Sequence, residues 1–362
     1  MVRVATLQLT PPEVGNTRAN IDAIRSLLRS QLASGGRTQH ENIDLLVLPE
    51  MITTGYRFSD PGVIQSICED VSQLQEDSPS IVLGSEIARE MHAYVVLGFA
   101  ERREASPSST MTEGGSRYTT SRPYDARSPP FYESSSSSDK YEYFNSAALF
   151  DRTGALVHCF RKHFLYDDDK VWAQEGPGFE YVDIPDLGRL CVGICMDLNP
   201  YEFKAPFESF ELASFCRQHN VDILALPTAW LLSKDGSESQ DEDEGEDQAS
   251  GPEDPHMPTV EYWAWRCMPL YSSTSSPASS TQPRGRRTIF ISANRTGTEQ
   301  GVTFAGSSSI LQFDNEVTSS SSTQSSASSQ SPASGSVKLL AAMGTETQGL
   351  QSVTVQLDWN PK

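Results

Sequence analysis

Short apolar segments of β-forming residues recur along this chain, separated by turn signals and by amphipathic helical patterns. In the first hundred residues, strands are expected at 2–9, 44–49 and 94–100, with helices at 17–34 and 79–91 between them. A strand followed by a helix and then by another strand is typical of an α/β sheet whose faces are covered by helices. We therefore predict an α/β fold.

The same pattern continues through the rest of the chain. Two apolar segments joined by a turn at 151–154 predict a β-hairpin. The expected strands are 145–150, 155–160, 190–194, 221–226, 288–293, one starting at 306–310 and 352–357, and the expected helices lie near 206–219 and 260–270. A chain of 362 residues can bury one large core, so we treat residues 1–362 as a single domain.

Four polar tracts interrupt this pattern, at residues 104–140, 233–255, 272–284 and 318–336. They are rich in serine, proline, glycine or acidic residues and contain few apolar side chains. Such sequences cannot bury enough surface to offset the entropy of ordering. We expect all four to be disordered surface insertions and not domain boundaries.

The charge and the cysteines exclude several classes of protein. The formal net charge is −20, much of it from the acidic run at 241–247, and no basic patch balances it. This argues against nucleic acid or an anionic membrane as a partner. The six cysteines form no CxxC pair and no zinc-type spacing with histidine, so no metal site is predicted.

The location is expected to be cytoplasmic. The first strand begins at residue 2, which leaves no room for a signal peptide, and no apolar run approaches the roughly 20 residues of a membrane span. Free thiols in a reducing compartment are the default for such a chain. The oligomeric state stays open.

Three chemically useful side chains directly follow predicted strands: Glu50, Lys162 and Cys195. Each has a simpler interpretation, as a helix cap, a surface cation and a buried inert thiol respectively. Together they supply the base, the oxyanion donor and the nucleophile that acyl transfer requires. The proline at 200 turns the chain after the Cys195 segment, which favours exposure of the thiol to a cleft.

These residues lie in motifs that resemble the catalytic motifs of the nitrilase (carbon–nitrogen hydrolase) superfamily, in the same order. The motifs are Leu-Pro-Glu at 48–50, Arg-Lys-His at 161–163 and Gly-Ile-Cys-Met-Asp at 193–197, with further similarity at 227–230, 294–299 and 306–308. The continuation Cys-Met-Asp-Leu-Asn-Pro at 195–200, together with 162–166, most resembles the fungal protein N-terminal asparagine/glutamine amidases. The resemblance implies a nitrilase-like α-β-β-α sandwich.

The resemblance and the chemistry imply a mechanism without metal or cofactor. Cys195 is expected to attack a carboxamide carbon while Glu50 takes up its proton. Lys162 and the backbone N–H of Met196 are expected to stabilise the oxyanion, and a thioester on Cys195 is then hydrolysed. The family often carries a second glutamate soon after the lysine. Here the sequence offers an aspartate run at 167–169 and Glu175, and the second acid stays unassigned.

The implied reaction is hydrolysis of the side-chain carboxamide of N-terminal Asn or Gln in proteins or peptides, giving Asp or Glu and ammonia, as part of an N-degron pathway. The alternatives are a nitrilase-superfamily amidase or carbamoylase acting on small free amides, N-carbamoyl compounds or nitriles, and a non-catalytic scaffold. An intact triad argues against the scaffold.

Recognition of an N-terminal residue requires a partner for its α-ammonium group, because burying a cation unpaired is unfavourable. The candidates are Asp197, Glu299 and the run 167–169, with Tyr56 and Trp230 as walls of the cleft. Asp197 has a second interpretation, as a structural carboxylate that braces the turn of the nucleophile.

Overall fold

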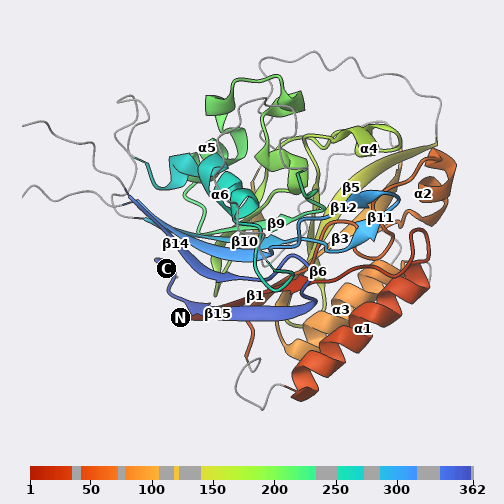
Figure 1. Cartoon of the computed structure of the whole chain (residues 1–362), viewed down its shortest axis with the longest axis horizontal. Coiled ribbons are helices and arrows are strands. Elements are labelled where there is room, and N and C mark those ends of the chain that lie inside the picture. Colours follow the sequence, from red (N-terminus) through yellow and green to blue (C-terminus); the bar gives the residue numbers. More distant parts are fainter. Residues whose placement is uncertain are drawn as a thin grey trace, which may run out of the picture.

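The structure is a computed structural model that describes residues 1–34, 42–71, 78–105, 118–121, 140–233, 251–272, 286–315 and 335–359. The described residues form two large sheets and a two-stranded ribbon, with helices on both outer faces (Figure 1). The longer helices are α1 (Thr17–Ser34), α3 (Pro79–Met91), α5 (Glu211–Gln218) and α6 (Met257–Arg266), and the shorter ones are α2 (Pro61–Ile67) and α4 (Asp167–Lys170).

The first sheet joins the beginning of the chain to its end. Its order is β15 (Gly349–Val355), β1 (Val2–Gln8), β2 (Leu45–Val47), β3 (Tyr94–Glu104), β5 (Tyr141–Phe150) and β6 (Leu156–Arg161). Strands β1, β2 and β3 are parallel, and β15, β5 and β6 pair antiparallel with their neighbours. The predicted hairpin at 145–160 is the β5–β6 pair.

The second sheet has the same plan, a parallel centre with antiparallel edges. Its order is β14 (Ser336–Ala342), β13 (Ser309–Asp314), β10 (Arg287–Ala293), β9 (Ile223–Pro227), β8 (Gly188–Val192), β7 (Tyr181–Ile184) and β4 (Thr119–Thr120). Strands β8, β9 and β10 are parallel. The ribbon pairs β11 (Thr298–Glu299) with β12 (Val302–Thr303).

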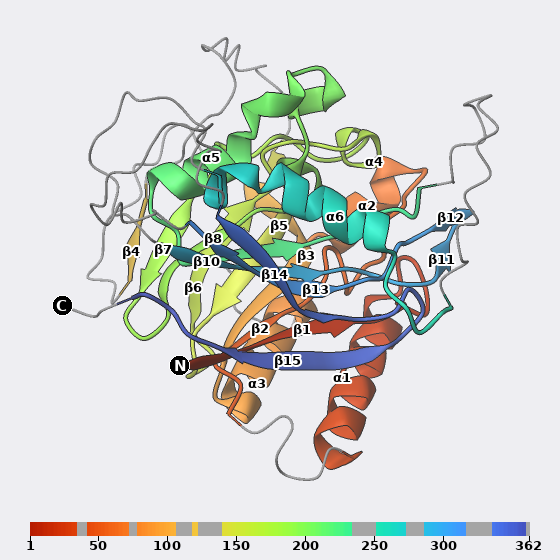
Figure 2. The same cartoon turned by 60° about the vertical axis from the view of Figure 1, so that its left-hand side comes forward.

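The strands read as continuous apolar runs because both faces of each sheet are buried. On β1, Val4 packs between the two sheets, whereas its neighbour Ala5 packs under α1 and α3. On β9, Ile223 faces the space between the sheets and Leu224 faces α5 and α6. Figure 2 shows the resulting four layers. The predicted α-β-β-α sandwich is confirmed.

The polar tracts are not wholly without structure, which corrects part of the prediction. Residues 119–120 of the first tract form β4 and extend the second sheet beside β7, and Tyr118 packs against the cluster between the sheets. At the end of the second tract, Asp254 accepts a hydrogen bond from the backbone N–H of Thr345. Residues 106–117, 122–139, 234–250, 273–285 and 316–334 lie outside the described residues, so the prediction for them is not addressed.

Some elements differ from the sequence prediction. The strand expected at 190–194 ends at Val192, and Cys195 instead begins a 3₁₀ turn, η1 (Cys195–Leu198). Strands β7 and β14 and helix α2 were not predicted. None of the helices in the described ranges is both long and apolar enough to cross a membrane.

Candidate active site

Residues that follow strands of both sheets meet at one edge of the sandwich. Glu50 follows β2, Lys162 follows β6, Cys195 follows β8 and Ala229 follows β9. Carboxyl ends of parallel strands lie at the same edge of their sheet, and the packing of the two sheets brings residues from both edges together, which is why positions so distant in sequence converge. The structure therefore brings the three predicted catalytic side chains into one cluster.

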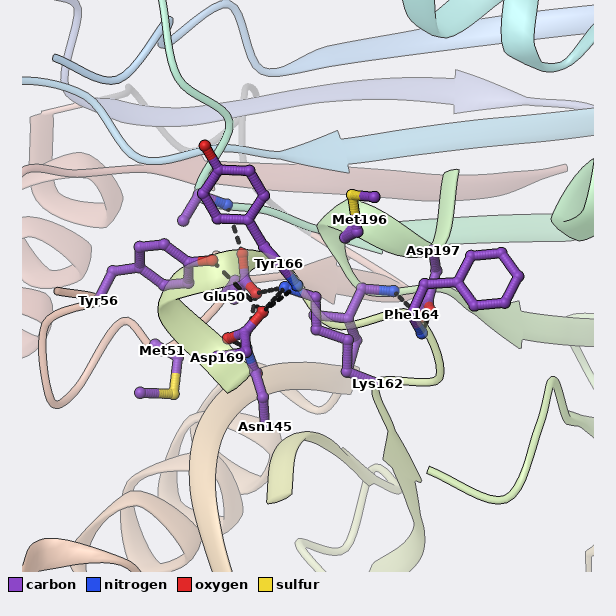
Figure 3. A network of polar contacts seen from close by, with 12 residues as sticks. Glu50, Met51, Tyr56, Asn145, Lys162, Phe164, Tyr166, Asp169, Met196 and Asp197 are labelled. Atoms are coloured by element: carbon purple, nitrogen blue, oxygen red, sulfur yellow. Dashed lines mark hydrogen bonds and ion pairs between the residues drawn. The ribbon is translucent and has the colours of Figure 1, made fainter. Parts of the chain in front are cut away.

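Two buried carboxylates hold Lys162. Its Nζ donates to Oε1 of Glu50 at 2.7 Å and to Oδ2 of Asp169 at 2.5 Å (Figure 3). All three side chains are at most 1% exposed. Asn145 joins the two acids, since its Nδ2 donates to Oε1 of Glu50 at 2.7 Å and to Oδ1 of Asp169 at 2.8 Å. Asp169 is thus the acid that the sequence left unassigned.

Backbone groups fix the rest of this network. The second oxygen of Glu50 accepts the N–H of Ala229 at 2.8 Å. Asp169 also accepts the N–H of Tyr166 at 2.9 Å, at the start of the short helix α4. Lysine carries three N–H donors, and the two carboxylates take two of them. No described residue is recorded as accepting the third donor, so it can serve a substrate oxygen.

Burial and charge set the protonation states of this cluster. Burial raises the pKa of Glu50, and the positive charge of Lys162 opposes that rise. Burial by itself would lower the pKa of Lys162, but the charges of Asp169 and Glu50 outweigh it and the pKa is raised. Lys162 therefore stays cationic at neutral pH.

Cys195 has an uncommon backbone conformation. Its φ is +46°, in the left-handed region that a non-glycine residue adopts only when the surroundings impose it. Burial raises the pKa of its thiol, the charge of Glu50 adds to the rise, and Lys162 opposes it. A thiol with a raised pKa can act as a nucleophile only if a neighbouring base takes up its proton.

Asp197 is the brace that holds this turn in place. Its Oδ2 accepts the N–H of Ile194 at 2.8 Å, and its Oδ1 accepts the N–H groups of His163 at 2.9 Å and Phe164 at 2.7 Å. It therefore ties the Cys195 turn to the segment that follows Lys162. Burial raises the pKa of Asp197 to about 7. Its oxygens are taken up by backbone groups, so the structure does not place Asp197 as a substrate-binding residue.

A cavity of about 350 Å³ lies over the thiol. Three of the predicted substrate-binding residues, Tyr56, Met196 and Trp230, line it together with Cys195. The other lining residues are Tyr166, Asn199, Phe203, Ala229, Leu231, Ser233, Pro258, Thr259 and Tyr262. Met196 is the second residue of η1, where a backbone N–H has no acceptor within the turn. Its N–H makes no recorded backbone hydrogen bond in the described part of the chain, so it can donate to an oxyanion.

Glu299, the other predicted substrate-binding residue, lies behind the wall of the cavity. Its Oε1 accepts the N–H groups of Tyr56 at 2.8 Å and Arg57 at 2.6 Å, and its Oε2 pairs with Arg295 at 2.6 Å. These bonds occupy the carboxylate. Glu299 therefore does not line the cavity, which corrects the expectation, but it fixes the backbone that carries Tyr56.

Asn294 fixes the backbone of Trp230, another residue of the cavity wall. Its Oδ1 accepts the N–H of Trp230 at 2.8 Å, and its Nδ2 donates to the carbonyl of Trp230 at 3.3 Å and that of Gly306 at 2.8 Å. The segment at 294–299 was noticed in the sequence, but its position behind both walls was not predicted. Asn145 carried no signal in the sequence at all.

No group of three or more His, Cys, Asp or Glu side chains in the described ranges is arranged to hold a metal ion. The cationic lysine next to the thiol supplies the positive charge that an oxyanion needs.

This fold, with a cysteine, a lysine and a glutamate at strand ends and an aspartate from α4 beside the lysine, is typical of a hydrolase of carbon–nitrogen bonds. Residues 3–205 match the carbon–nitrogen hydrolase family, and the chain belongs to it. It is therefore a hydrolase that acts on carbon–nitrogen bonds other than peptide bonds.

Within the family, the chain is similar to protein N-terminal amidases. It is 31% identical over 318 residues to Protein N-terminal amidase of Schizosaccharomyces pombe, which covers 83% of this chain and 88% of that protein. It is 26% identical to Protein N-terminal amidase of Saccharomyces cerevisiae over 66% of this chain, and it spans about half of that protein, 47%. A crystal structure of N-terminal amidase with an Asn-Glu-Ala peptide has the same fold, with a TM-score of 0.71, 21% identity and 98% of each chain covered.

Proposed function

We propose that this enzyme hydrolyses the side-chain carboxamide of an N-terminal Asn or Gln in proteins and peptides, giving Asp or Glu and ammonia. The observation that carries the proposal is the cluster of Cys195, Lys162, Glu50 and Asp169 beneath a cavity large enough for one such residue. The similarity to the protein N-terminal amidase of Schizosaccharomyces pombe supports the choice of substrate.

The reaction begins with attack of the Cys195 sulfur on the carboxamide carbon. The thiol proton passes to Glu50, and the carbonyl oxygen becomes an oxyanion. The free donor of Lys162 and the N–H of Met196 stabilise this oxyanion, and one such donor is typically worth about 3 kcal/mol. Glu50 then returns the proton to the amide nitrogen, the C–N bond breaks and ammonia leaves.

A thioester between Cys195 and the substrate remains. Water attacks it while Glu50 accepts a proton from that water, and a second oxyanion forms in the same place. When this intermediate collapses, the carboxylic acid leaves and Cys195 regains its proton. Glu50 thus acts twice as a base and twice as an acid, which fits a carboxyl group whose pKa is raised by burial.

Asp169 acts through Lys162. Two carboxyl groups surround one ammonium group in this cluster, and the raised pKa of Lys162 keeps the lysine a cation throughout the cycle. Because two acceptors hold the ammonium group, its third N–H has a fixed direction. Such a preorganised donor costs no reorganisation when charge develops.

The cellular setting we propose is an N-degron pathway in the cytoplasm. All six cysteines are free thiols, and the nucleophile must stay reduced to work, which suits a reducing compartment. Conversion of N-terminal Asn or Gln to Asp or Glu gives the first residue of the substrate a negatively charged side chain. A downstream enzyme of this pathway would recognise that carboxylate.

Mass spectrometry of short peptides tests the proposal. Peptides that begin with Asn or Gln should gain the mass change of deamidation when incubated with the protein, and an otherwise identical peptide that begins with Ala but carries an internal Asn should not. The Cys195→Ala variant should leave all of them unchanged. Equal rates on free acetamide or on α-acetylated peptides would instead favour an amidase for small amides.

A further inference from the structure

The cavity over Cys195 combines aromatic walls with a single buried amide side chain. Asn199 is 5% exposed and follows the η1 turn that carries the nucleophile. It lines the cavity together with Trp230 and Tyr262. It also belongs to the segment 195–200 that set this chain apart in the sequence, and the mechanism above gives it no role.

No carboxylate is among the described residues that line this cavity. The acids nearby are already occupied. Asp197 and Glu299 accept backbone N–H groups, and Asp168 pairs with Arg57 at 3.2 Å. An N-terminal substrate nevertheless brings a cation, because the α-amino group has a pKa of about 7.7–8.0 and is charged at neutral pH.

The side chain of Asn199 is fixed so that one acceptor is left over. Its Oδ1 accepts the hydroxyl of Tyr262 at 2.7 Å, and its Nδ2 contacts the sulfur of Met196 at 3.5 Å. An amide oxygen has two lone pairs, so one remains after the bond to Tyr262. The assignment of the two amide atoms follows from these partners.

The aromatic rings beside Asn199 suit a cation. The ring of Tyr262 lies 5.6 Å from that of Trp230, and Asn294 clamps the backbone of Trp230 from behind. Ring faces of Trp and Tyr attract an ammonium group within about 6 Å.

We propose that Asn199, oriented by Tyr262, receives the α-ammonium group of the substrate, with the faces of Tyr262 and Trp230 completing the site. This inference rests on the proposed function and names how that function distinguishes an N-terminal Asn from an internal one. Selectivity for the free N-terminus then comes from a neutral oxygen and aromatic faces, and not from a carboxylate.

A pair of substrates that differ only in the ammonium group tests this. One is an Asn-initiated peptide, and the other is the same peptide with a succinamoyl group in place of Asn, which keeps the carboxamide and lacks the amine. The wild type should favour the ammonium substrate in kcat/KM by roughly thirtyfold, in the range of a hydrogen bond to a charged group. Asn199→Leu should reduce this ratio to within about threefold of one.

Two further variants separate recognition from folding. Asn199→Asp keeps an acceptor oxygen and should keep the preference. Tyr262→Phe removes the orienting hydroxyl and should lower the preference severalfold, whereas Tyr271→Phe should leave it unchanged. Tyr271 is the matched control because its hydroxyl donates to the carbonyl of Ala264 and it does not line the cavity.

The outcomes are distinct. If Asn199→Leu slows both substrates equally and keeps the wild-type ratio, the residue is only structural and the inference fails. The same holds if Asn199→Asp loses the preference as completely as Asn199→Leu. If the wild type hydrolyses neither substrate, the proposed function itself fails.

Discussion

The Asp169→Asn variant probes the part of the site that the sequence left open. Asp169 accepts Lys162 at 2.5 Å, the N–H of Tyr166 at 2.9 Å and Nδ2 of Asn145 at 2.8 Å. An amide in its place has one oxygen and one NH₂ group, so it cannot accept from all three donors. It also removes the charge that contributes to the raised pKa of Lys162.

Two effects should follow, one on the catalytic rate and one on the stability of the fold. The third N–H of Lys162 loses its fixed direction, and loss of an oxyanion donor typically removes about 3 kcal/mol of transition-state stabilisation, roughly 150-fold in kcat. KM should change little, because Asp169 does not line the cavity. The free energy of unfolding should fall by about 1.5–3 kcal/mol, the usual range for a hydrogen bond to a charged group.

The assay is steady-state ammonia release from an Asn-initiated peptide, combined with urea denaturation. Asp168→Asn is the matched control, since Asp168 pairs at 3.2 Å with Arg57, whose side chain is 33% exposed, and such partly exposed pairs contribute under about 1 kcal/mol. The reasoning is refuted if Asp169→Asn keeps kcat within threefold of the wild type, or if Asp168→Asn has the larger effect.

Three other predictions follow from the same geometry. Burial raises the pKa of Glu50, and the base must be ionised to accept a proton. In a pH–rate profile, kcat/KM should therefore fall as the pH drops through a midpoint above the usual glutamate pKa of about 4.3. A midpoint at or below about 4.3 would contradict this. Gly98→Ala should lower kcat by about 10²-fold, because a Cβ there would lie 2.5 Å from the carbonyl oxygen of Pro49 and 2.7 Å from Cα of Glu50 and would displace the proposed base. Unchanged steady-state kinetics in this variant would contradict the prediction. Tyr118→Ala should lower the free energy of unfolding by about 1–3 kcal/mol in urea denaturation, because Tyr118 packs against the cluster between the sheets and donates to Asp151. An unchanged free energy of unfolding would show that this residue does not pack on the core.

Most of the strands could be predicted because both faces of each sheet are buried. That burial leaves a continuous apolar run in the sequence, which is visible for β1, β3, β9 and β10. Strand β7 was missed because it is short and contains an aspartate, Asp183, which pairs with Arg189 on β8 at 2.7 Å. Strand β4 was missed because only its pairing with β7 orders it.

The proposed catalytic side chains, Glu50, Lys162 and Cys195, were identified from their position after strands, whereas the residues that support them were not. Asn145 lies within β5, and nothing in its local sequence indicates that its amide bridges two acids. Asp169 was one of three consecutive aspartates, and only the start of α4 turns it toward Lys162. The roles of Asp197 and Glu299 depend on backbone groups up to 243 residues away, which no local pattern contains.

The central claim is a thioester on Cys195 formed from a side-chain carboxamide, and trapping it is the most direct test. The enzyme is mixed with an Asn-initiated peptide, quenched in acid within a turnover, digested and analysed by mass spectrometry. The account predicts a transient adduct on the fragment that contains Cys195, with the mass of the peptide less ammonia, which disappears on addition of neutral hydroxylamine and yields the peptide hydroxamate. Turnover at the wild-type rate in Cys195→Ala, or an adduct on any of the other five cysteines in place of Cys195, would contradict it.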